Sequence, residues 1–194
     1  MDSLLDFSGQ VALITGAGSG FGRLLSKGLA ERGCKLVISD IDPKGLAETV
    51  ETLSDFADSV IAQHCDVSKE ADCKAMVDSA MDKFGRVDIG VNNAGIAHSM
   101  APMHTIDEAT MDKQMDVNVK GVMFGMKYQI EVMLKQGSGH ILNVSSLAGL
   151  GGAPKGAAYS AAKHAVIGLT KTAAIEYARK GIRANSICPF YTPT

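Results

Sequence analysis

The residues best suited to do chemistry are Tyr159 and Lys163, which stand four positions apart in the alanine-rich stretch 159–163. On a helix, two residues with this spacing lie on one face. A free phenol has a pKa of about 10 and is protonated at neutral pH, and a neighbouring ammonium favours the phenolate. Such a pair can move a proton to or from a substrate oxygen. The same spacing also suits an ordinary tyrosine–lysine pair on a helix surface.

Two serines precede this pair. Ser145 and Ser146 follow the apolar run 140–144, and Ser146 lies 13 residues before Tyr159. A hydroxyl in that place can hydrogen-bond a substrate oxygen while negative charge develops on it. The chain therefore carries the parts of a proton-transfer site, provided that the fold brings them together.

Short apolar runs alternate with helical stretches and would have to position these groups. Each run is nearly continuous in apolar residues, as expected for strands that are buried on both faces. The alternation predicts a Rossmann-type doubly wound parallel sheet, with right-handed crossovers and three α/β/α layers. Folds of this kind bind ligands beyond the carboxyl ends of their strands. The predicted strands are 11–14, 35–39, 60–62, 87–91, 140–144 and 182–187.

Local signals mark where several helices begin and end. Asp42, before a proline, is a predicted N-cap, and 105–108 is a predicted capping box whose glutamate reaches back to the cap amide. Gly33 and Gly181 follow cations, which is typical of helix C-termini. The stretch 107–135 carries apolar residues at helical spacing, which mostly indicates packing on the sheet.

A glycine-rich turn, 15–22, directly follows the first predicted strand and opens a helix. The glycines at 16, 20 and 22 permit a tight turn and allow a ligand to approach the backbone. The helix N-terminus offers amides and a partial positive charge to a pyrophosphate. The turn therefore predicts a dinucleotide site. A glycine-rich connector without a ligand is the alternative.

An acidic residue ends the second predicted strand. Asp40 comes 18 residues after Gly22, where a carboxylate can accept hydrogen bonds from ribose hydroxyls and would repel a 2′-phosphate. This position favours NAD over NADP as the cofactor. Asp42 lies close enough to take the same role, and Arg23 is the one nearby cation that would favour NADP.

In order and spacing, these motifs resemble the short-chain dehydrogenase/reductase family over residues 7 to about 189. The resemblance implies that Tyr159 is the general acid/base and that Lys163 favours its phenolate and contacts the nicotinamide ribose. It selects Ser146, rather than the neighbouring serine, to orient the substrate oxygen. It also implies that Asn118, which alone would be interpreted as a helix-surface amide, takes part in a proton relay.

The same resemblance supplies further cofactor contacts. An Asp-Val pair at 66–67 matches the family's adenine contacts, and 92–95 matches its Asn-Asn-Ala-Gly signature; without the resemblance, both would indicate only polar loops. The implied cofactor-binding residues are Gly16, Ser19, Gly20, Phe21, Gly22, Asp40, Asp66, Val67, Asn92, Ala94, Gly95, Tyr159, Lys163, Pro189, Thr192 and Thr194.

The C-terminal end departs from the family pattern. Phe190 replaces a glycine that lets the backbone approach the nicotinamide, and the chain stops at Thr194. Family members continue through a substrate-covering segment and a last strand. We therefore expect one catalytic domain over 1–194 that is shortened at its C-terminal end, either as a fragment or as a natural short form.

Composition argues against several classes of protein. The 19 basic and 21 acidic residues leave a net charge of −2, which predicts no nucleic-acid or anionic-membrane partner. No apolar run approaches the roughly 18 residues of a membrane span, and the N-terminus lacks the pattern of a signal peptide. The cysteine and histidine spacings predict no metal site. The four cysteines indicate reduced thiols and a cytoplasmic location.

The leading expectation is an NAD-dependent oxidoreductase that interconverts a secondary alcohol and a ketone. The alternatives are an NADP-dependent ketone reductase and an inactive scaffold or sensor that binds the cofactor. Small apolar loops at 96–103 and 150–156 favour an apolar alcohol. In the family, the helix that corresponds to 107–135 pairs with its copy, so we expect a homodimer or homotetramer built from this helix and the helix that carries Tyr159.

Overall fold

The structure is a computed structural model and describes residues 5–190. Strands and helices alternate along the chain as predicted, with a π-helical turn at Asp116–Lys120 and a short 3-10 turn at Leu147–Gly149. The strands and main helices are β1 (Val11–Thr15), α1 (Gly20–Ala30), β2 (Lys35–Asp40), α2 (Pro43–Thr52), β3 (Val60–His64), α3 (Glu70–Phe84), β4 (Ile89–Asn92), α4 (Glu108–Met115), α5 (Gly121–Gln136), β5 (Gly139–Val144), α6 (Ala157–Tyr177) and β6 (Ile182–Ile187).

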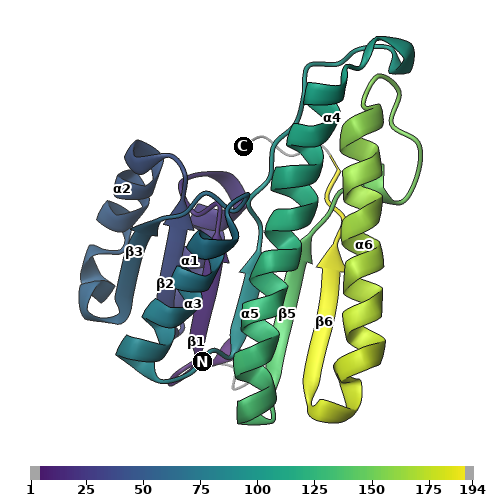
Figure 1. Cartoon of the computed structure of the whole chain (residues 1–194). Helices are drawn as coiled ribbons and strands as arrows, with labels where there is room; N and C mark the ends of the chain where they lie inside the picture. Colours follow the sequence, from purple (N-terminus) through teal and green to yellow (C-terminus); the bar gives the residue numbers. More distant parts are fainter. Residues whose placement is uncertain (1–4, 191–194) are drawn as a thin grey trace.

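The strands form a parallel sheet in the order β3-β2-β1-β4-β5-β6 (Figure 1). The order reverses between β1 and β4, where the chain crosses from one half of the sheet to the other. In open α/β sheets, ligands bind at this reversal, beyond the carboxyl ends of the strands. The predicted Rossmann-type doubly wound fold is confirmed.

Helices cover both faces of the sheet and enclose two main apolar clusters. On one face, α1 and α2 pack on a cluster that includes Ile14 and Ile38. On the other face, α3, α5 and α6 pack on a cluster that includes Leu13 and Ile141. Successive residues of β1 thus point into different layers, as the two-residue period of a strand requires. Within residues 5–190, no helix is both long and apolar enough to cross a membrane.

The prediction that every strand is buried on both faces is wrong for the two edge strands. In β6, Ile182 and Ala184 are buried, whereas Arg183, Asn185 and Ile187 are exposed. β3 also alternates between covered and exposed positions. An edge strand has a neighbour on one side only, so helices cover it less completely than the central strands.

The predicted capping box at 105–108 is also wrong. Helix α4 begins at Glu108, and its N-cap is Asp107, whose carboxylate accepts the Thr110 N–H at 2.8 Å. The Thr105 hydroxyl instead donates to the Pro102 carbonyl. Asp and Ser/Thr are both good N-caps, and here the carboxylate of Asp107, two residues after Thr105, caps the helix.

Candidate active site

The glycine-rich turn connects β1 to α1 and is shaped by steric limits that only glycine meets. Gly16 has a φ of +66°, and a Cβ there would lie 2.8 Å from the Ala94 Cα. A Cβ on Gly22 would collide with the Gly16 carbonyl. Ser19 is the N-cap of α1 but makes no side-chain cap hydrogen bond, and the first turn carries no acid. The N-terminus of α1 therefore presents backbone amides and a partial positive charge with no acidic residue in its own first turn.

The loop after β4 is fastened to this turn. The Asn93 amide donates to the carbonyls of Thr15 and Gly16 at 2.9 and 3.0 Å. The buried Thr15 hydroxyl accepts the N–H groups of Asn93 and Ala94, both at 3.1 Å. These hydrogen bonds thus hold the glycine-rich turn after β1 and the loop after β4 at a fixed separation.

Asp40 lies at the end of β2 beside the turn. Its carboxylate accepts the Gly18 N–H at 2.8 Å and the Asp42 N–H at 2.9 Å. A carboxylate can accept about four hydrogen bonds, so Asp40 retains acceptor capacity toward the cleft that it lines. Asp42 instead caps α2 by accepting from Lys44 and Gly45, as predicted.

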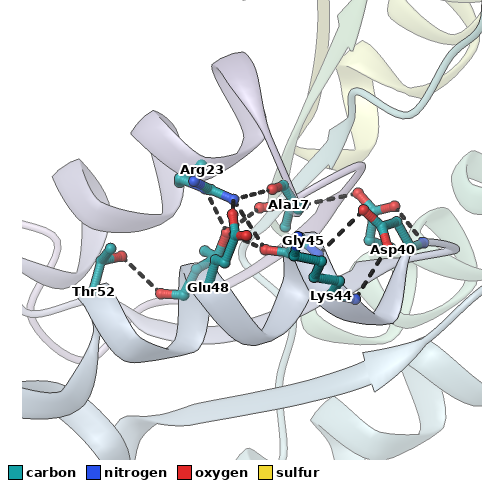
Figure 2. A network of polar contacts seen from close by, with 10 residues as sticks. Ala17, Arg23, Asp40, Lys44, Gly45, Glu48 and Thr52 are labelled. Carbon is teal, nitrogen blue, oxygen red and sulfur yellow. Dashed lines mark hydrogen bonds and ion pairs between the residues drawn. The ribbon is translucent and has the colours of Figure 1, made fainter.

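Arg23, the one cation near the turn, is committed elsewhere. Its guanidinium pairs with Glu48 at 2.9 Å and donates to the carbonyls of Gly18 and Gly45. Figure 2 shows Arg23 of α1 and Glu48 of α2 pointing toward each other, with Asp40 at the other end of the polar network. These contacts bind α1 to α2 and leave the Asp40 carboxylate as the charged group at the end of β2 that lines the cleft.

A cleft of about 470 Å³ lies along the carboxyl ends of β1 to β4. Its lining residues come from the glycine-rich turn, the end of β2 and the end of β3. The predicted cofactor residues that line it are Gly16, Ser19, Gly20, Phe21, Asp40, Asp66, Val67, Ala94 and Gly95. Lining residues that the sequence did not single out are Ile41, Cys65, Asn93, Ile96, Lys113 and Val117.

Five predicted cofactor residues in the described part of the chain do not line this cleft: Gly22, Asn92, Tyr159, Lys163 and Pro189. Gly22 is buried behind the turn, where it allows α1 to approach Gly16. Asn92 points into the layer of α5, where its amide bonds to Asn143 at 2.8 Å and to Gln129 at 3.0 and 3.2 Å. The Asn92 side chain is thus engaged inside the fold, and the next residue, Asn93, lies in the cleft wall. Neighbouring residues at a strand end point to opposite faces, so a shift of one residue decides whether a side chain faces the cleft or the layer of α5.

The two serines after β5 have different roles. Ser145 is buried and donates to the Lys163 carbonyl at 2.9 Å, which fastens β5 to α6. Ser146 is half-buried, and its Oγ accepts the Ala148 N–H at 3.2 Å. That contact uses a lone pair and leaves the hydroxyl hydrogen available to a ligand. The structure is consistent with Ser146 as the reactive member of the pair.

Tyr159 and Lys163 lie one turn apart on α6, as predicted, and the Lys163 Nζ is 5.6 Å from the centre of the Tyr159 ring. Lys163 is only 4% exposed. Its ammonium donates to the Val144 carbonyl at 2.9 Å, and no described carboxylate pairs with it. Burial lowers the pKa of Lys163 to about 8. A cation that remains mostly charged at pH 7 is therefore held in a low-dielectric position beside the phenol.

Asn118 is fully buried, so the interpretation of its side chain as a helix-surface amide is wrong. It lies in the π-helical turn between α4 and α5. Its Oδ1 accepts the Ile96 N–H at 2.9 Å, and its Nδ2 donates to the Ile96 carbonyl at 2.8 Å and to Gln114 at 2.7 Å. Both ends of the amide are thus used to fix the loop after β4. Single π-turns often occur at functional sites.

Gly95 joins the two halves of the site. It lines the cleft, and a Cβ there would lie 2.8 Å from Asn118 Oδ1 and 3.3 Å from Lys163 Nζ. Ser146, Tyr159 and Lys163 do not themselves line the cleft. They lie beyond its Gly95 end, on the β5 and α6 side of the sheet reversal.

The segment after β6 is described only in part. Pro189 is half-buried, and its carbonyl accepts the Leu147 N–H at 2.9 Å, next to Ser146. Phe190 is 70% exposed. Thr192 and Thr194, both predicted cofactor contacts, lie outside the described residues.

Known proteins share this fold and much of this sequence. The family model for short chain dehydrogenases matches residues 10–194. Levodione reductase of Leifsonia aquatica is 40% identical over 193 residues, which cover 96% of this chain and 72% of the relative. An uncharacterized oxidoreductase of Thermotoga maritima is 45% identical over 188 residues, covering 95% of this chain and 72% of the relative.

Solved structures agree. The crystal structure of levodione reductase matches with a TM-score of 0.92 at 40% identity and covers 95% of this chain and 72% of that chain. A short-chain dehydrogenase/reductase of Burkholderia phymatum in complex with NAD also matches with a TM-score of 0.92, at 38% identity, over 97% of this chain and 68% of that chain.

The sheet order, the glycine turn and the Tyr159/Lys163 pair define an oxidoreductase with a Rossmann-type fold. The chain belongs to the short-chain dehydrogenase/reductase family.

Proposed function

We propose that this protein catalyses the reversible oxidation of a secondary alcohol to a ketone with NAD. The observation that carries the proposal is the buried Lys163 ammonium beside the Tyr159 ring, next to the Gly95 end of the cleft. A buried charge without an acidic partner is costly for stability, and such groups are common at functional sites. An effect of the Lys163 charge on the Tyr159 phenol would explain why the protein keeps a buried charge without an acidic partner.

The cleft fits a dinucleotide. Glycines at 16 and 22 would let the backbone and the N-terminus of α1 approach a pyrophosphate, and Asp40 would accept hydrogen bonds from ribose hydroxyls. Asp66 and Val67 would flank the adenine, while Lys163 would reach the nicotinamide ribose. Bound NAD would supply the hydride acceptor. The preference for NAD over NADP is supported by the Asp40 charge and by the commitment of Arg23 to Glu48.

Tyr159 would take the hydroxyl proton of the alcohol as its hydride leaves, and it would return that proton in the reverse direction. Lys163 supports this transfer because its positive charge favours the phenolate. Ser146 would donate its hydroxyl hydrogen to the substrate oxygen. Asn118 would take part in the proton relay, and its amide also fixes the Ile96 backbone through two hydrogen bonds.

An apolar substrate is the best match to the loops beyond β4 and β5. Met100, Met103, Leu147 and Leu150 expose large apolar side chains there, and the Ala101 N–H donates to the Lys155 carbonyl, which joins the two loops. A relative from Acinetobacter, 39% identical, is named cyclohexanol dehydrogenase. We therefore favour an apolar, cyclic secondary alcohol.

A homodimer or homotetramer, one catalytic domain per chain and a cytoplasmic location belong to the same proposal. Met111, Met123, Leu134 and Ile175 expose apolar side chains on α4, α5 and α6, which stand side by side (Figure 1). Exposed apolar groups on neighbouring helices suit a self-complementary interface.

The test is an assay of nicotinamide reduction with a panel of linear, cyclic and aromatic secondary alcohols, using NAD and NADP in parallel. Turnover with NAD, greatest for apolar cyclic alcohols, is expected. Turnover with NADP alone would favour a ketone reductase of the other cofactor class. Cofactor binding without any turnover across the panel would instead favour an inactive scaffold.

A further inference from the structure

A series of hydrogen bonds leads from Arg23 on α1, through α2, to the Asp40 carboxylate (Figure 2). The Arg23 Nε–H donates to the Thr49 hydroxyl at 2.9 Å, and that hydroxyl donates to the Ala17 carbonyl at 2.8 Å. The peptide unit with this carbonyl also contains the Gly18 N–H, which donates to Asp40 Oδ2 at 2.8 Å. All three donors point the same way, from a cation to an anion. We call this series the Arg23–Asp40 network.

Thr49 is the buried member of the network. Its side chain is fully buried, and its hydroxyl lies nearer to the Ala17 carbonyl, at 2.8 Å, than to the Gly45 carbonyl of its own helix, at 3.1 Å. A helical threonine commonly bonds the carbonyl four residues back, whereas here the shorter contact reaches the glycine-rich turn. Helix α2 can approach the turn because Gly45 has no side chain: a Cβ there would lie 2.8 Å from the Gly18 carbonyl oxygen.

Further contacts hold Arg23 at its end of the network. Its guanidinium pairs with Glu48 at 2.9 Å and donates to the carbonyls of Gly18 and Gly45. The Gly18 carbonyl belongs to the peptide unit that follows the Gly18 Cα, and the Gly18 N–H belongs to the one that precedes it. Arg23 and Thr49 together thus fix both peptide units on either side of the Gly18 Cα.

The other end of the network is the carboxylate that lines the cleft. Asp40 accepts the Gly18 N–H on one oxygen and the Asp42 N–H, at 2.9 Å, on the other. Both oxygens are therefore anchored, and the lone pairs that remain have a fixed direction. Hydrogen bonds that follow one another polarise and strengthen each other. The orientation of Asp40 thus depends on Arg23 and Thr49, although neither of them lines the cleft.

We propose that Arg23 and Thr49 are positioning residues that set the choice between NAD and NADP through Asp40. An anchored carboxylate accepts ribose hydroxyls without first losing side-chain freedom, and it cannot turn away from a 2′-phosphate. Both effects favour NAD. Arg23 therefore acts in the opposite sense to a free cation near the turn, which would attract the phosphate of NADP. This assignment rests on the proposed function, because it concerns the cofactor that the cleft would bind.

Thr49→Val tests the buried member, because valine has nearly the shape of threonine and lacks the hydroxyl. Calorimetry should show NAD affinity about 3- to 10-fold weaker than in wild type and NADP affinity less affected, so that the preference for NAD narrows at least about two-fold. Thr49→Ser keeps the hydroxyl and should bind both cofactors within about two-fold of wild type. Thr52→Val is the matched control and should do the same, because the Thr52 hydroxyl donates to the Thr49 carbonyl at 2.7 Å, outside the network.

The Asp40→Ala background separates an effect through Asp40 from an effect on the turn. If Thr49 acts through the carboxylate, Thr49→Val should change NAD affinity less than about two-fold once the carboxylate is absent. An undiminished loss of affinity in that background would overturn the inference. Equal weakening of NAD and NADP by Thr49→Val alone would also overturn it, because the hydroxyl would then only shape the turn, which both cofactors share.

Arg23→Gln is a second variant, at a partly exposed side chain, if the valine protein does not fold. Loss of the cation that anchors the network should narrow the preference for NAD at least about two-fold. A direct attraction between Arg23 and the 2′-phosphate would give the opposite sign, since its loss would weaken NADP more than NAD. A preference for NAD that widens in Arg23→Gln would therefore contradict the assignment.

The amide proton of Gly18 reports on the network without any cofactor. Its NMR resonance in the cofactor-free protein should move upfield in Thr49→Val and in Asp40→Ala, and it should stay in place in Thr52→Val. A Gly18 resonance that does not respond to Thr49→Val would refute the network itself. A wild-type protein that shows these shifts but binds neither NAD nor NADP would refute the proposed function, and with it the effect on cofactor choice, while the network would stand.

Discussion

Replacing Lys163 with methionine is expected to stabilise the protein while abolishing its turnover. The Lys163 ammonium is buried, and its pKa lies at about 8 against an ordinary value of 10.5. That difference corresponds to about 3 kcal/mol of unfolding free energy lost at pH 7. Methionine has a similar length and no charge, but it leaves the Val144 carbonyl without its donor, which costs about 1–2 kcal/mol. The net gain is about 1–2 kcal/mol.

The pH dependence of this gain identifies its cause. Below pH 8, the folded and unfolded states both bind the lysine proton, and the cost is fully present. Between pH 8 and 10.5, the unfolded state binds more protons, so wild-type stability rises with pH relative to the variant. The difference between the two proteins should shrink by about 2 kcal/mol from pH 7 to pH 9.5. Groups that titrate alike in both proteins cancel in this difference.

Urea unfolding of the cofactor-free proteins at several pH values measures the effect. Lys171 on the same helix is exposed, so Lys171→Met is the matched control, with a change within about 0.5 kcal/mol at every pH. A Lys163→Met protein that is less stable than wild type at pH 7, or a gain that does not change with pH, would refute the reasoning.

The remaining predictions concern cofactor choice, the second helix and assembly. Asp40→Ala should weaken NAD binding about 10- to 150-fold and narrow the preference over NADP in calorimetry, since a charged acceptor is lost. Asp42→Ala should lower the free energy of unfolding by about 1 kcal/mol in thermal unfolding, because the α2 N-cap is lost, and should change the preference for NAD over NADP little. If Asp42→Ala changed this preference more than Asp40→Ala, the roles assigned to the two residues would be reversed. Sedimentation should show a dimer or larger assembly at micromolar concentration, and Leu134→Lys should weaken it. A wild-type monomer would contradict the proposed interface.

The sequence predicted the strands and the cleft well because both depend on local patterns. Apolar runs marked each strand to within a few residues, and parallel strands bring their carboxyl ends to one edge. Asp40 and the glycine turn were therefore placed together, although they are far apart along the chain, whereas Asp66 was assigned to the same cleft through the family resemblance. Tyr159 and Lys163 needed only the helical period to share a face.

The errors came from features that require the three-dimensional register. Asn92 and its successor both follow an apolar run, and only the pairing of β4 with β5 decides which one faces the cleft. The burial of Asn118 depends on a π-turn, which no pattern in the sequence indicates. Exposure along β6 depends on its place at the edge of the sheet. No motif in the sequence marks Cys65 as a residue that lines the cleft, because its position follows from the end of β3 and the packing of α3.

The most direct test of the central claim is the fate of hydrogen in the reaction. The protein would be incubated with NAD and cyclohexanol that carries deuterium at the carbinol carbon, and the reduced nicotinamide would be analysed by mass spectrometry and NMR. The account predicts that deuterium passes to the nicotinamide ring without dilution by solvent, and that Tyr159→Phe abolishes this transfer while NAD affinity stays within a few-fold of wild type. Solvent hydrogen in the reduced cofactor, or undiminished transfer in Tyr159→Phe, would contradict it.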